Sequence, residues 1–534
     1  MSSLNSGFEL KRSGTGVLTI GKEIGYDLGH VDEYGFDTTP KDIRVLLINP
    51  PVSFDVFYGE WDLSDVKSSS PPIGILSLAS MVRKYGYEVK VLDAHADNLD
   101  MNGILKVVEE FKPHIVCLTA MTVMVSASAQ IAKSIKEKYP DILNMIGGVH
   151  LTAEPTKTME FYHPAFDYGC IGEGEVVLVD FLEKWRKNED VTQIQSLVWR
   201  DSDGKYHSNQ RRMFFKGLDE FPPPAFDLVP NLFNHYRLSV FGTKKFRSVG
   251  LVTSRGCTGK CTFCDLGVVG RGYRANSATY LITLMKDLYE KYDVSDFLFY
   301  DDLFVGSKPR LKEICEWIIR EKLPFTWSCC ARVDFMHKEM LSMMKQAGCW
   351  LVEYGIESGC QRIIDSMRKN ITKEKIRDTI NATHDAGIIT KGNFIFGNPG
   401  ETHDSIRESI DFACSLKLNY AQHTFLQPLP GSELYETAGK YGEFDPSWDR
   451  FNTFSINFIP HGFTRDDLVA YSKYFWRKFY LRPKIWWQEC RKISTWEDVQ
   501  RLWLAFKGFV KSTIYSRKLP DFVLRQRQPV GLVH

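Results

Sequence analysis

The sequence has almost no net charge and no long apolar run. Its 534 residues carry 67 Lys and Arg against 66 Asp and Glu, which leaves a formal net charge of +1. Proteins that coat nucleic acid are strongly basic, so this balance argues against that class. No stretch approaches the roughly 18 consecutive apolar residues of a membrane-spanning helix, and residues 1–22 lack the apolar core of a signal peptide. We therefore expect a cytoplasmic protein.

Cysteine is also sparse. Twelve cysteines are too few for a disulfide scaffold, and in a reducing compartment cysteines are more often metal ligands or small buried residues. A hydrophobic content of 43% excludes disorder over most of the chain. At roughly 100–200 residues per domain, the length predicts two to four domains.

Strand and helix patterns alternate along two stretches of the chain. In the first, the apolar run IRVLLIN (Ile43–Asn49) followed by Pro50 and Pro51 is typical of a buried parallel strand. Further strands and helices alternate after it, which predicts a doubly wound, Rossmann-like parallel sheet at residues 41–185. Ligands of such sheets bind at the carboxyl ends of the strands.

The second alternating stretch begins at Val249 and contains six strand-like segments. It predicts a partial (β/α)6 barrel at residues 249–435, so the fold class is α/β, with the chemistry at the carboxyl ends of the strands. The remaining regions are an N-terminal arm at 1–40, a linker at 186–248 that contains Pro222–Pro224, and a basic, aromatic, helical C-terminal region at 436–534.

The strongest chemical signal follows the first strand of the second stretch. Cys257, Cys261 and Cys264 lie in the segment SRGCTGKCTFCD with the spacing C-x3-C-x2-C. Three thiolates on one tight loop can hold three irons of a 4Fe-4S cluster and leave the fourth iron open for a substrate or cofactor. A zinc site is the alternative, but structural zinc sites close with four ligands in paired spacings.

This loop, with Phe263 before its last cysteine, resembles the radical S-adenosylmethionine (radical SAM) superfamily. The resemblance implies that S-adenosylmethionine binds the open iron, that reductive cleavage yields a 5′-deoxyadenosyl radical, and that this radical abstracts hydrogen from an unactivated carbon. It also implies an external one-electron donor of the flavodoxin or ferredoxin type. The second strand ends in Asp-Asp, where the family more commonly has a Gly-Gly-Glu type of sequence. The implied contacts of S-adenosylmethionine are Phe263, Asp301, Asp302, Arg332, Glu357, Ser358, Asn398 and Gln427.

The N-terminal sheet region resembles the cobalamin-binding domain of cobalamin-dependent radical SAM enzymes. The matching segments include NPP (49–51), IGGVHLTAEP (146–155) and IGEGE (171–175). The D-x-H-x-x-G signature, whose histidine ligates cobalt, is not intact after Asp93, so no cobalt-ligating histidine is assigned. A flavodoxin-like domain that binds nothing is the alternative. The implied cobalamin-binding residues are Pro50, Ser70, Thr119, Thr122, Gly147, Gly148, His150 and Glu173.

Two reactions fit this pair of domains. In the first, cobalamin supplies a methyl group to a substrate radical, which gives C-methylation. In the second, the radical undergoes oxidative cyclisation or forms a C–C bond on a porphyrin-like or lipid substrate. The segment Trp476–Trp487 resembles the anaerobic magnesium-protoporphyrin monomethyl ester cyclase branch. A third hypothesis is a non-enzymatic iron–sulfur protein that senses cobalamin or the redox state. No catalytic proton donor is assigned, although Cys329 and Cys330 lie near the expected active face.

Basic residues gather near the C-terminus. The segment Arg477–Arg527 holds 13 Lys and Arg against four Asp and Glu, interleaved with aromatic residues. This pattern fits contact with anionic lipid or a large apolar substrate, a helix packed across the barrel mouth, or RNA binding, which the near-neutral body makes the weakest reading. We expect a small apolar or lipid-like substrate and no nucleic acid, with peripheral membrane contact left open.

Overall fold

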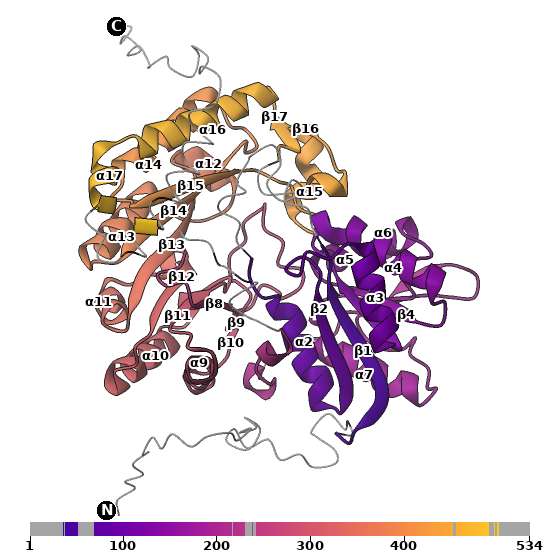
Figure 1. Cartoon of the computed structure of the whole chain (residues 1–534). Coiled ribbons are helices and arrows are strands. Elements are labelled where there is room, and N and C mark those ends of the chain that lie inside the picture. The colour runs from indigo at the N-terminus through magenta and orange to yellow at the C-terminus, as the bar shows by residue number, and fades with distance from the viewer. Residues whose placement is uncertain are drawn as a thin grey trace, which may run out of the picture.

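The described part of the chain forms two α/β units that lie side by side, each built around one large sheet (Figure 1). Both sheets are wholly or mainly parallel, as the alternating strand and helix patterns predict. The computed structural model describes residues 36–503 with gaps at 37, 52–68, 216, 230–235, 237, 239–241, 452–454, 491–495, 497–498 and 501–502.

The first unit contains a seven-stranded sheet in the order β2-β1-β3-β4-β5-β6-β7. Strand β1, the second in this order, is apolar and buried because helices cover both of its faces. The strand order reverses between β1 and β3, and ligands of such sheets bind at the carboxyl ends of the strands at this point. The strands are β1 (Lys41–Asn49), β2 (Tyr87–Asp93), β3 (Ile115–Thr119), β4 (Leu143–Gly147), β5 (Tyr168–Cys170), β6 (Leu197–Arg200) and β7 (Tyr206–Ser208). The helices are α2 (Ile73–Lys84), α3 (Met101–Phe111), η3 (Thr122–Met124), α4 (Val125–Lys138), α5 (Val149–Ala153), α6 (Pro155–Phe161) and α7 (Gly174–Arg186).

The first sheet extends beyond residue 185, so the assignment of the whole segment 186–248 to a linker is wrong. Strand β6 pairs antiparallel with β5, and β7 pairs antiparallel with β6. The connection between β6 and β7 is a tight turn in which Gly204 adopts a φ of +86°. Each strand is only three or four residues long, which is too short for a clear alternation of apolar and polar residues.

The second unit is a six-stranded parallel sheet in the order β15-β14-β13-β12-β11-β8, curved into a partial barrel with β15 and β8 at its edges (Figure 1). Its strands are β8 (Ser248–Leu251), β11 (Asp296–Phe299), β12 (Thr326–Ala331), β13 (Cys349–Glu357), β14 (Ile389–Phe396) and β15 (Tyr420–Phe425), and a short antiparallel pair, β9 (Ser254–Arg255) and β10 (Arg274–Ala275), lies beside them. The helices are α9 (Ala278–Tyr292), α10 (Lys308–Glu321), α11 (Lys338–Gln346), α12 (Gln361–Ser366), α13 (Lys373–Asp385) and α14 (His403–Ser415).

Helix α16 (Arg465–Tyr480) covers the outer face of the barrel. Its fully buried Phe475 contacts the rings of Phe394 and His423, which point away from the barrel interior. The expectation of a helix across the barrel mouth is therefore wrong for α16, because its apolar stripe matches the outward-facing residues of β14 and β15. The other C-terminal elements are α15 (Glu433–Thr437), the antiparallel pair β16 (Gly442–Phe444) and β17 (Phe458–Pro460), and α17 (Pro483–Cys490).

Within the described residues, no helix combines the length and the apolar character that crossing a bilayer requires.

Candidate active site

The three cysteines of the C-x3-C-x2-C segment lie on the loop between β9 and β10. Gly256 opens this loop with a φ of +83°, and its N–H donates to Asp302 Oδ2 at 3.1 Å. A Cβ atom on Gly256 would lie 2.0 Å from the Gly272 carbonyl oxygen, so only glycine fits there. The pairing of β9 with β10 closes the base of the loop. The segment therefore folds as one tight loop, as its spacing predicts.

The surroundings of the thiols fit an iron–sulfur cluster. Burial, together with nearby Cys261, Asp302 and Cys257, raises the pKa of Cys264 to about 12. Cationic iron relieves such repulsion by stabilising thiolates. In the residues that the structure describes, no three His, Cys, Asp or Glu side chains converge on a single metal ion. Cysteines that bind different irons of one cluster need no such convergence.

The two aspartates after β11 differ in role. Both carboxylate oxygens of Asp301 accept hydrogen bonds inside the protein, from the Thr253 N–H at 2.5 Å and from the hydroxyls of Thr253 and Ser254 at 2.8 Å. Asp301 is only 2% exposed and thus organises the end of β8. Asp302 is exposed beside the cysteine loop. Of the two, Asp302 is the better placed to contact S-adenosylmethionine.

Arg332 connects the cysteine loop to the end of β13. Its Nη1 lies 3.7 Å from the Cys261 sulfur, and its Nη2 donates to the Lys369 carbonyl oxygen at 2.8 Å. The Lys369 ammonium in turn pairs with Glu357 Oε1 at 2.6 Å, and both side chains are about nine-tenths buried. Glu357 adopts a φ of +66°, a conformation that non-glycine residues rarely adopt. The structure thus joins Arg332 and Glu357 through Lys369, a residue that the sequence alone does not single out.

The remaining predicted contacts of S-adenosylmethionine follow the strand ends but mostly contact protein. The Ser358 hydroxyl lies 3.0 Å from the Ser409 hydroxyl, and Gln427 Nε2 donates to the Ser455 carbonyl oxygen. Phe263 packs against two small apolar clusters. Asn398 is fully buried beside β14, and its Oδ1 lacks a hydrogen-bond partner among the described residues. Asn398 Oδ1 is therefore one buried acceptor beside β14 that is left for a ligand.

A polar row crosses the inside of the barrel. The strand register places Cys330 beside Glu353 and Glu353 beside Lys391, and Tyr300 extends the row at the end of β11. Lys391 Nζ pairs with Glu353 Oε1 at 3.0 Å, with both side chains largely buried. Interiors of such barrels are usually filled with branched aliphatic side chains. A tyrosine, a thiol and an ion pair in one layer are therefore candidates for substrate contact.

The register also separates the two adjacent cysteines. Cys330 faces the interior, where burial and neighbouring Glu353 raise the pKa of its thiol. Cys329 is fully buried on the outer face, where a hydrogen bond with Cys349 and, after it, burial raise the pKa of its thiol. Only Cys330 lies on the side where a substrate could reach it.

Five of the predicted cobalamin-binding residues gather at the carboxyl edge of the first sheet. Gly148 has a φ of +106°, and a Cβ atom there would lie 2.7 Å from the Ala120 carbonyl oxygen. The Thr122 hydroxyl lies 3.3 Å from His150 Nδ1, while His150 Nε2 is buried and has no partner among the described residues. Burial lowers the pKa of His150 to about 4, so the ring is neutral at physiological pH. The five residues are Thr119, Thr122, Gly147, Gly148 and His150.

This edge fits a bulky ligand with a large apolar surface. Met121 and Val149, which follow β3 and β4, are 44% and 43% exposed. Gly147 carries no side chain at the same edge, and the nearest atom to an added Cβ would be 3.6 Å away. The broken D-x-H-x-x-G segment contributes no ligand through Asp93, because Tyr236 and Asn49 donate to its carboxylate.

Of the other three predicted cobalamin contacts, Pro50 also follows a strand at this edge, whereas Ser70 and Glu173 face the second unit. Pro50 is buried at the end of β1. Ser70 lies near Tyr300 of the second unit, because both would lie close to a Cβ added at Gly250. Both carboxylate oxygens of Glu173 are engaged by arginines of the second unit. Glu173 is therefore not free to bind cobalamin in this arrangement.

Comparison with known families agrees with this division. Residues 62–182 match the B12 binding domain, and residues 251–413 match the Radical SAM superfamily. An uncharacterized methyltransferase of Pyrococcus horikoshii is 30% identical over 452 residues, which cover 83% of this chain and 94% of the relative. The chain belongs to the cobalamin-dependent radical SAM enzymes. Its cofactors are a 4Fe-4S cluster, S-adenosylmethionine and cobalamin. The hypothesis of a non-enzymatic sensor is therefore rejected.

Other relatives in this family carry out two kinds of chemistry. The cytidylyl-2-hydroxyethylphosphonate methyltransferase of Streptomyces wedmorensis is 26% identical and covers 76% of this chain and 83% of its own length. The anaerobic magnesium-protoporphyrin IX monomethyl ester cyclase of Rubrivivax gelatinosus is 25% identical, with 86% and 82% covered. The radical SAM methyltransferase TsrM of Kitasatospora setae, solved with cobalamin and a 4Fe-4S cluster, has a TM-score of 0.61 at 18% identity and covers 75% of each chain. The likeness to TsrM concerns the fold alone.

Proposed function

We propose that this chain is a C-methyltransferase that acts on an unactivated carbon of a small molecule. The observation that carries the proposal is its alignment with 94% of a relative named as a methyltransferase. When bound, the cluster with S-adenosylmethionine supplies a hydrogen-abstracting radical, and cobalamin supplies a methyl carrier. In this proposal the first unit holds cobalamin and the cysteine loop of the second unit holds the cluster, and Glu173 of the first unit pairs with Arg255 at the base of that loop.

In this proposal Cys257, Cys261 and Cys264 hold the cluster. Arg332 donates toward the Cys261 sulfur, so it stabilises negative charge on the ligand set. Asp302 is exposed beside the loop and binds the amino group of S-adenosylmethionine. Glu357 is held in place by Lys369 and orients the ribose. An external one-electron donor of the flavodoxin or ferredoxin type remains part of the proposal.

The substrate is proposed to be amphipathic rather than wholly apolar. Val252 and Tyr300, at the ends of β8 and β11, are 43% and 44% exposed and offer an apolar rim. In the same row as Tyr300, Glu353 and Lys391 offer both an acceptor and donors while their charges cancel. Such a pair suits an amide, a hydroxyl or a zwitterionic group better than a phosphate, which a net positive site binds best.

The proposal is tested with purified protein reconstituted under anaerobic conditions. With dithionite and S-adenosylmethionine, the wild type should form 5′-deoxyadenosine, and Cys261→Ala should lose the cluster absorbance and this product. Cys414→Ala is the matched control, because Cys414 lies between α14 and α16 away from the loop. An intact cluster in Cys261→Ala would refute the ligand assignment. A wild type with a full cluster that forms no 5′-deoxyadenosine would refute the enzymatic reading.

Radical oxidative cyclisation is the second candidate, because the cyclase of Rubrivivax gelatinosus aligns with 86% of this chain. Candidate substrates come from comparing metabolites and lipids of a deletion strain and its parent by mass spectrometry. S-adenosylmethionine with a labelled methyl group then separates the two reactions. Methylation predicts the label in the product, whereas cyclisation predicts a product without label.

Peripheral membrane contact through the C-terminal region also remains a proposal. Trp487, Trp496 and Trp503 are 60%, 73% and 55% exposed, and exposed tryptophans with basic residues favour anionic interfaces. Most of the segment from 491 onward lies outside the described residues. Co-sedimentation with vesicles of phosphatidylserine and phosphatidylcholine tests the contact, and absence of binding at low salt would refute it.

A further inference from the structure

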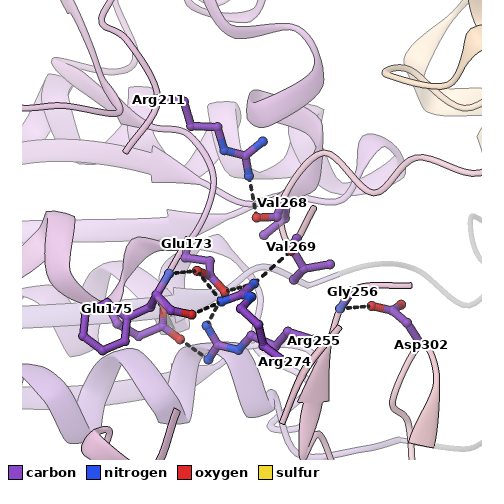
Figure 2. A network of polar contacts seen from close by, with 10 residues as sticks. Glu173, Glu175, Arg211, Arg255, Gly256, Val268, Val269, Arg274 and Asp302 are labelled. Atoms are coloured by element: carbon purple, nitrogen blue, oxygen red, sulfur yellow. Dashed lines mark hydrogen bonds and ion pairs between the residues drawn. The ribbon is translucent and has the colours of Figure 1, made fainter. Parts of the chain in front are cut away.

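A group of four charged side chains joins the cobalamin-binding unit to the base of the cysteine loop (Figure 2). Glu173 Oε1 accepts from Arg255 Nη1 and from Arg274 Nη2, both at 2.9 Å, and its Oε2 accepts from Arg274 Nη1 at 3.0 Å. Glu175 Oε1 accepts from Arg255 Nη2 at 2.5 Å. We call Glu173, Glu175, Arg255 and Arg274 the interdomain ion-pair group.

The group is largely removed from solvent. The side chains of Glu173 and Arg274 are 11% exposed, and those of Glu175 and Arg255 are 9% and 18% exposed. Burial alone would raise the pKa of Glu173, but Arg274 and Arg255 outweigh it and hold the pKa below its usual value. Glu173 is therefore ionised at neutral pH. Removing one partner of such a buried group is costly, because the others lose their counter-charge.

The two arginines of this group, Arg255 and Arg274, lie at the two ends of the cysteine loop. Arg255 ends β9 two residues before Cys257, and Arg274 lies on β10 where the loop returns. The two are direct partners in the β9–β10 register. The Glu173 carboxylate thus bonds to both ends of the loop that carries the three cysteines.

A chain of hydrogen bonds connects the same glutamate to the cobalamin edge. The Thr152 hydroxyl donates to the Gly148 carbonyl oxygen at 2.8 Å and accepts from the Gly172 N–H at 2.9 Å. Gly172, with a φ of +77°, directly precedes Glu173. The turn at Gly148 and the base of the cysteine loop are thus linked through Thr152 and the residues Gly172–Glu173.

We propose that Glu173 is a positioning residue that sets the cysteine loop at a defined place relative to the cobalamin edge. Cofactors that act on one substrate must be aligned, and a displacement of about 1 Å can reduce the rate on the order of a hundredfold. Glu173 acts through Arg255 and Arg274 and touches no reacting atom. Any effect of Glu173 on product formation depends on the proposed methyl transfer. The placement of the cysteine loop by Glu173 does not depend on that function.

The first test uses the full chain without cofactors. Glu173→Gln removes the charge but preserves the size, and amide hydrogen exchange should accelerate on the order of tenfold or more in the cysteine loop, because both arginines lose a charged partner. Asp167→Asn is the matched control, because Asp167 pairs with Lys136 inside the first unit. That variant should change exchange around β4 but not in the loop. Unchanged exchange in the loop of Glu173→Gln would overturn the proposal.

The second test uses reconstituted protein. Glu173→Gln should still bind iron, but the electron paramagnetic resonance spectrum of its reduced cluster with S-adenosylmethionine should broaden or shift. Glu173→Asp keeps the charge and should restore the wild-type spectrum in part. A spectrum of Glu173→Gln identical to the wild type would overturn the positioning role. Failure of the wild type to form 5′-deoxyadenosine would instead count against the proposed function.

Discussion

Among single residues, Glu401 gives the clearest dependence on pH. Its Oε2 accepts from the backbone N–H groups of Gly397 and Asn398, while its Oε1 is buried without a partner among the described residues. Burial raises the pKa of Glu401 to about 7. The folded chain therefore holds a proton that the unfolded chain releases near the ordinary pKa of about 4.3. The free energy of unfolding consequently falls as pH rises between these two values.

We predict that Glu401→Gln removes this dependence. Between pH 5 and pH 8 the wild type should lose about 2 kcal/mol through this group, whereas the amide does not titrate and still offers an oxygen to Gly397 and Asn398. The measurement is the difference in melting temperature between the two proteins across that range. Parallel curves for both proteins would show that Glu401 is ionised at neutral pH.

The ion pair inside the barrel gives a second prediction at this scale. Lys391→Met leaves the carboxylate of Glu353 largely buried without its cation, and we expect a loss of about 3 kcal/mol in the free energy of unfolding. The double variant Glu353→Gln with Lys391→Met should recover much of this loss, because no charge remains unpaired. Urea unfolding of the protein without cofactors provides the measurement. A loss in the double variant equal to the sum of the losses of the two single substitutions would contradict the pairing of Glu353 with Lys391.

Which neighbouring side chain reaches the active face could not be predicted from the sequence. The segments Asp301–Asp302 and Cys329–Cys330 both predict polar groups at strand ends, and the structure places both there. Successive residues of a strand point to opposite faces, so a shift of one residue exchanges their roles. Only the structure shows that Asp301 binds Thr253 while Asp302 is exposed beside the loop.

At the scale of elements, the turn between β4 and α5 tests the cobalamin edge. Gly148 has a positive φ, and an added Cβ would meet the Ala120 carbonyl oxygen at 2.7 Å. We predict that Gly148→Ala costs about 1–3 kcal/mol and weakens cobalamin binding. Gly147→Ala is the matched variant, because its Cβ would make only ordinary contacts within the protein.

The two variants separate folding from binding. Gly147→Ala should leave the melting temperature of the cofactor-free protein nearly unchanged but reduce cobalamin retention on a desalting column, because its methyl group enters the space for the ligand. Retention equal to that of the wild type would place cobalamin away from Gly147. The absorbance of the bound cofactor quantifies the result.

The regular elements could be predicted where a strand or helix is long and buried. The run IRVLLIN predicts a strand, and β1 covers Lys41–Asn49. The short strands β6 and β7 could not be predicted, because three or four residues are too few to show an alternation of apolar and polar residues. The packing of α16 on β14 and β15 also could not be inferred, because an amphipathic pattern shows that a helix packs but not what it packs against.

For the whole molecule, the two units share one continuous apolar core. A single cluster of buried side chains runs from Leu47 and Phe181 in the first unit to Leu251 and Phe475 in the second. The segment between the units takes part, since Phe221 and Phe226 belong to the cluster and the Ala225 N–H donates to the Leu76 carbonyl oxygen. A second cluster on the other face of the first sheet has buried residues from the first unit alone, so the core is shared in part and we expect the two units to unfold together.

This shared core predicts that cobalamin bound at the first unit stabilises the entire chain. At a free concentration a hundredfold above its dissociation constant, a ligand that binds only the folded state adds about 2.7 kcal/mol. Differential scanning calorimetry should show one transition that moves upward as a whole, and tryptophan fluorescence, which also reports on Trp327 inside the second unit, should shift with it. Two transitions, of which cobalamin moves only one, would show that the units fold separately. In that case the interdomain ion-pair group alone, and not a shared core, would have to keep the two cofactors aligned.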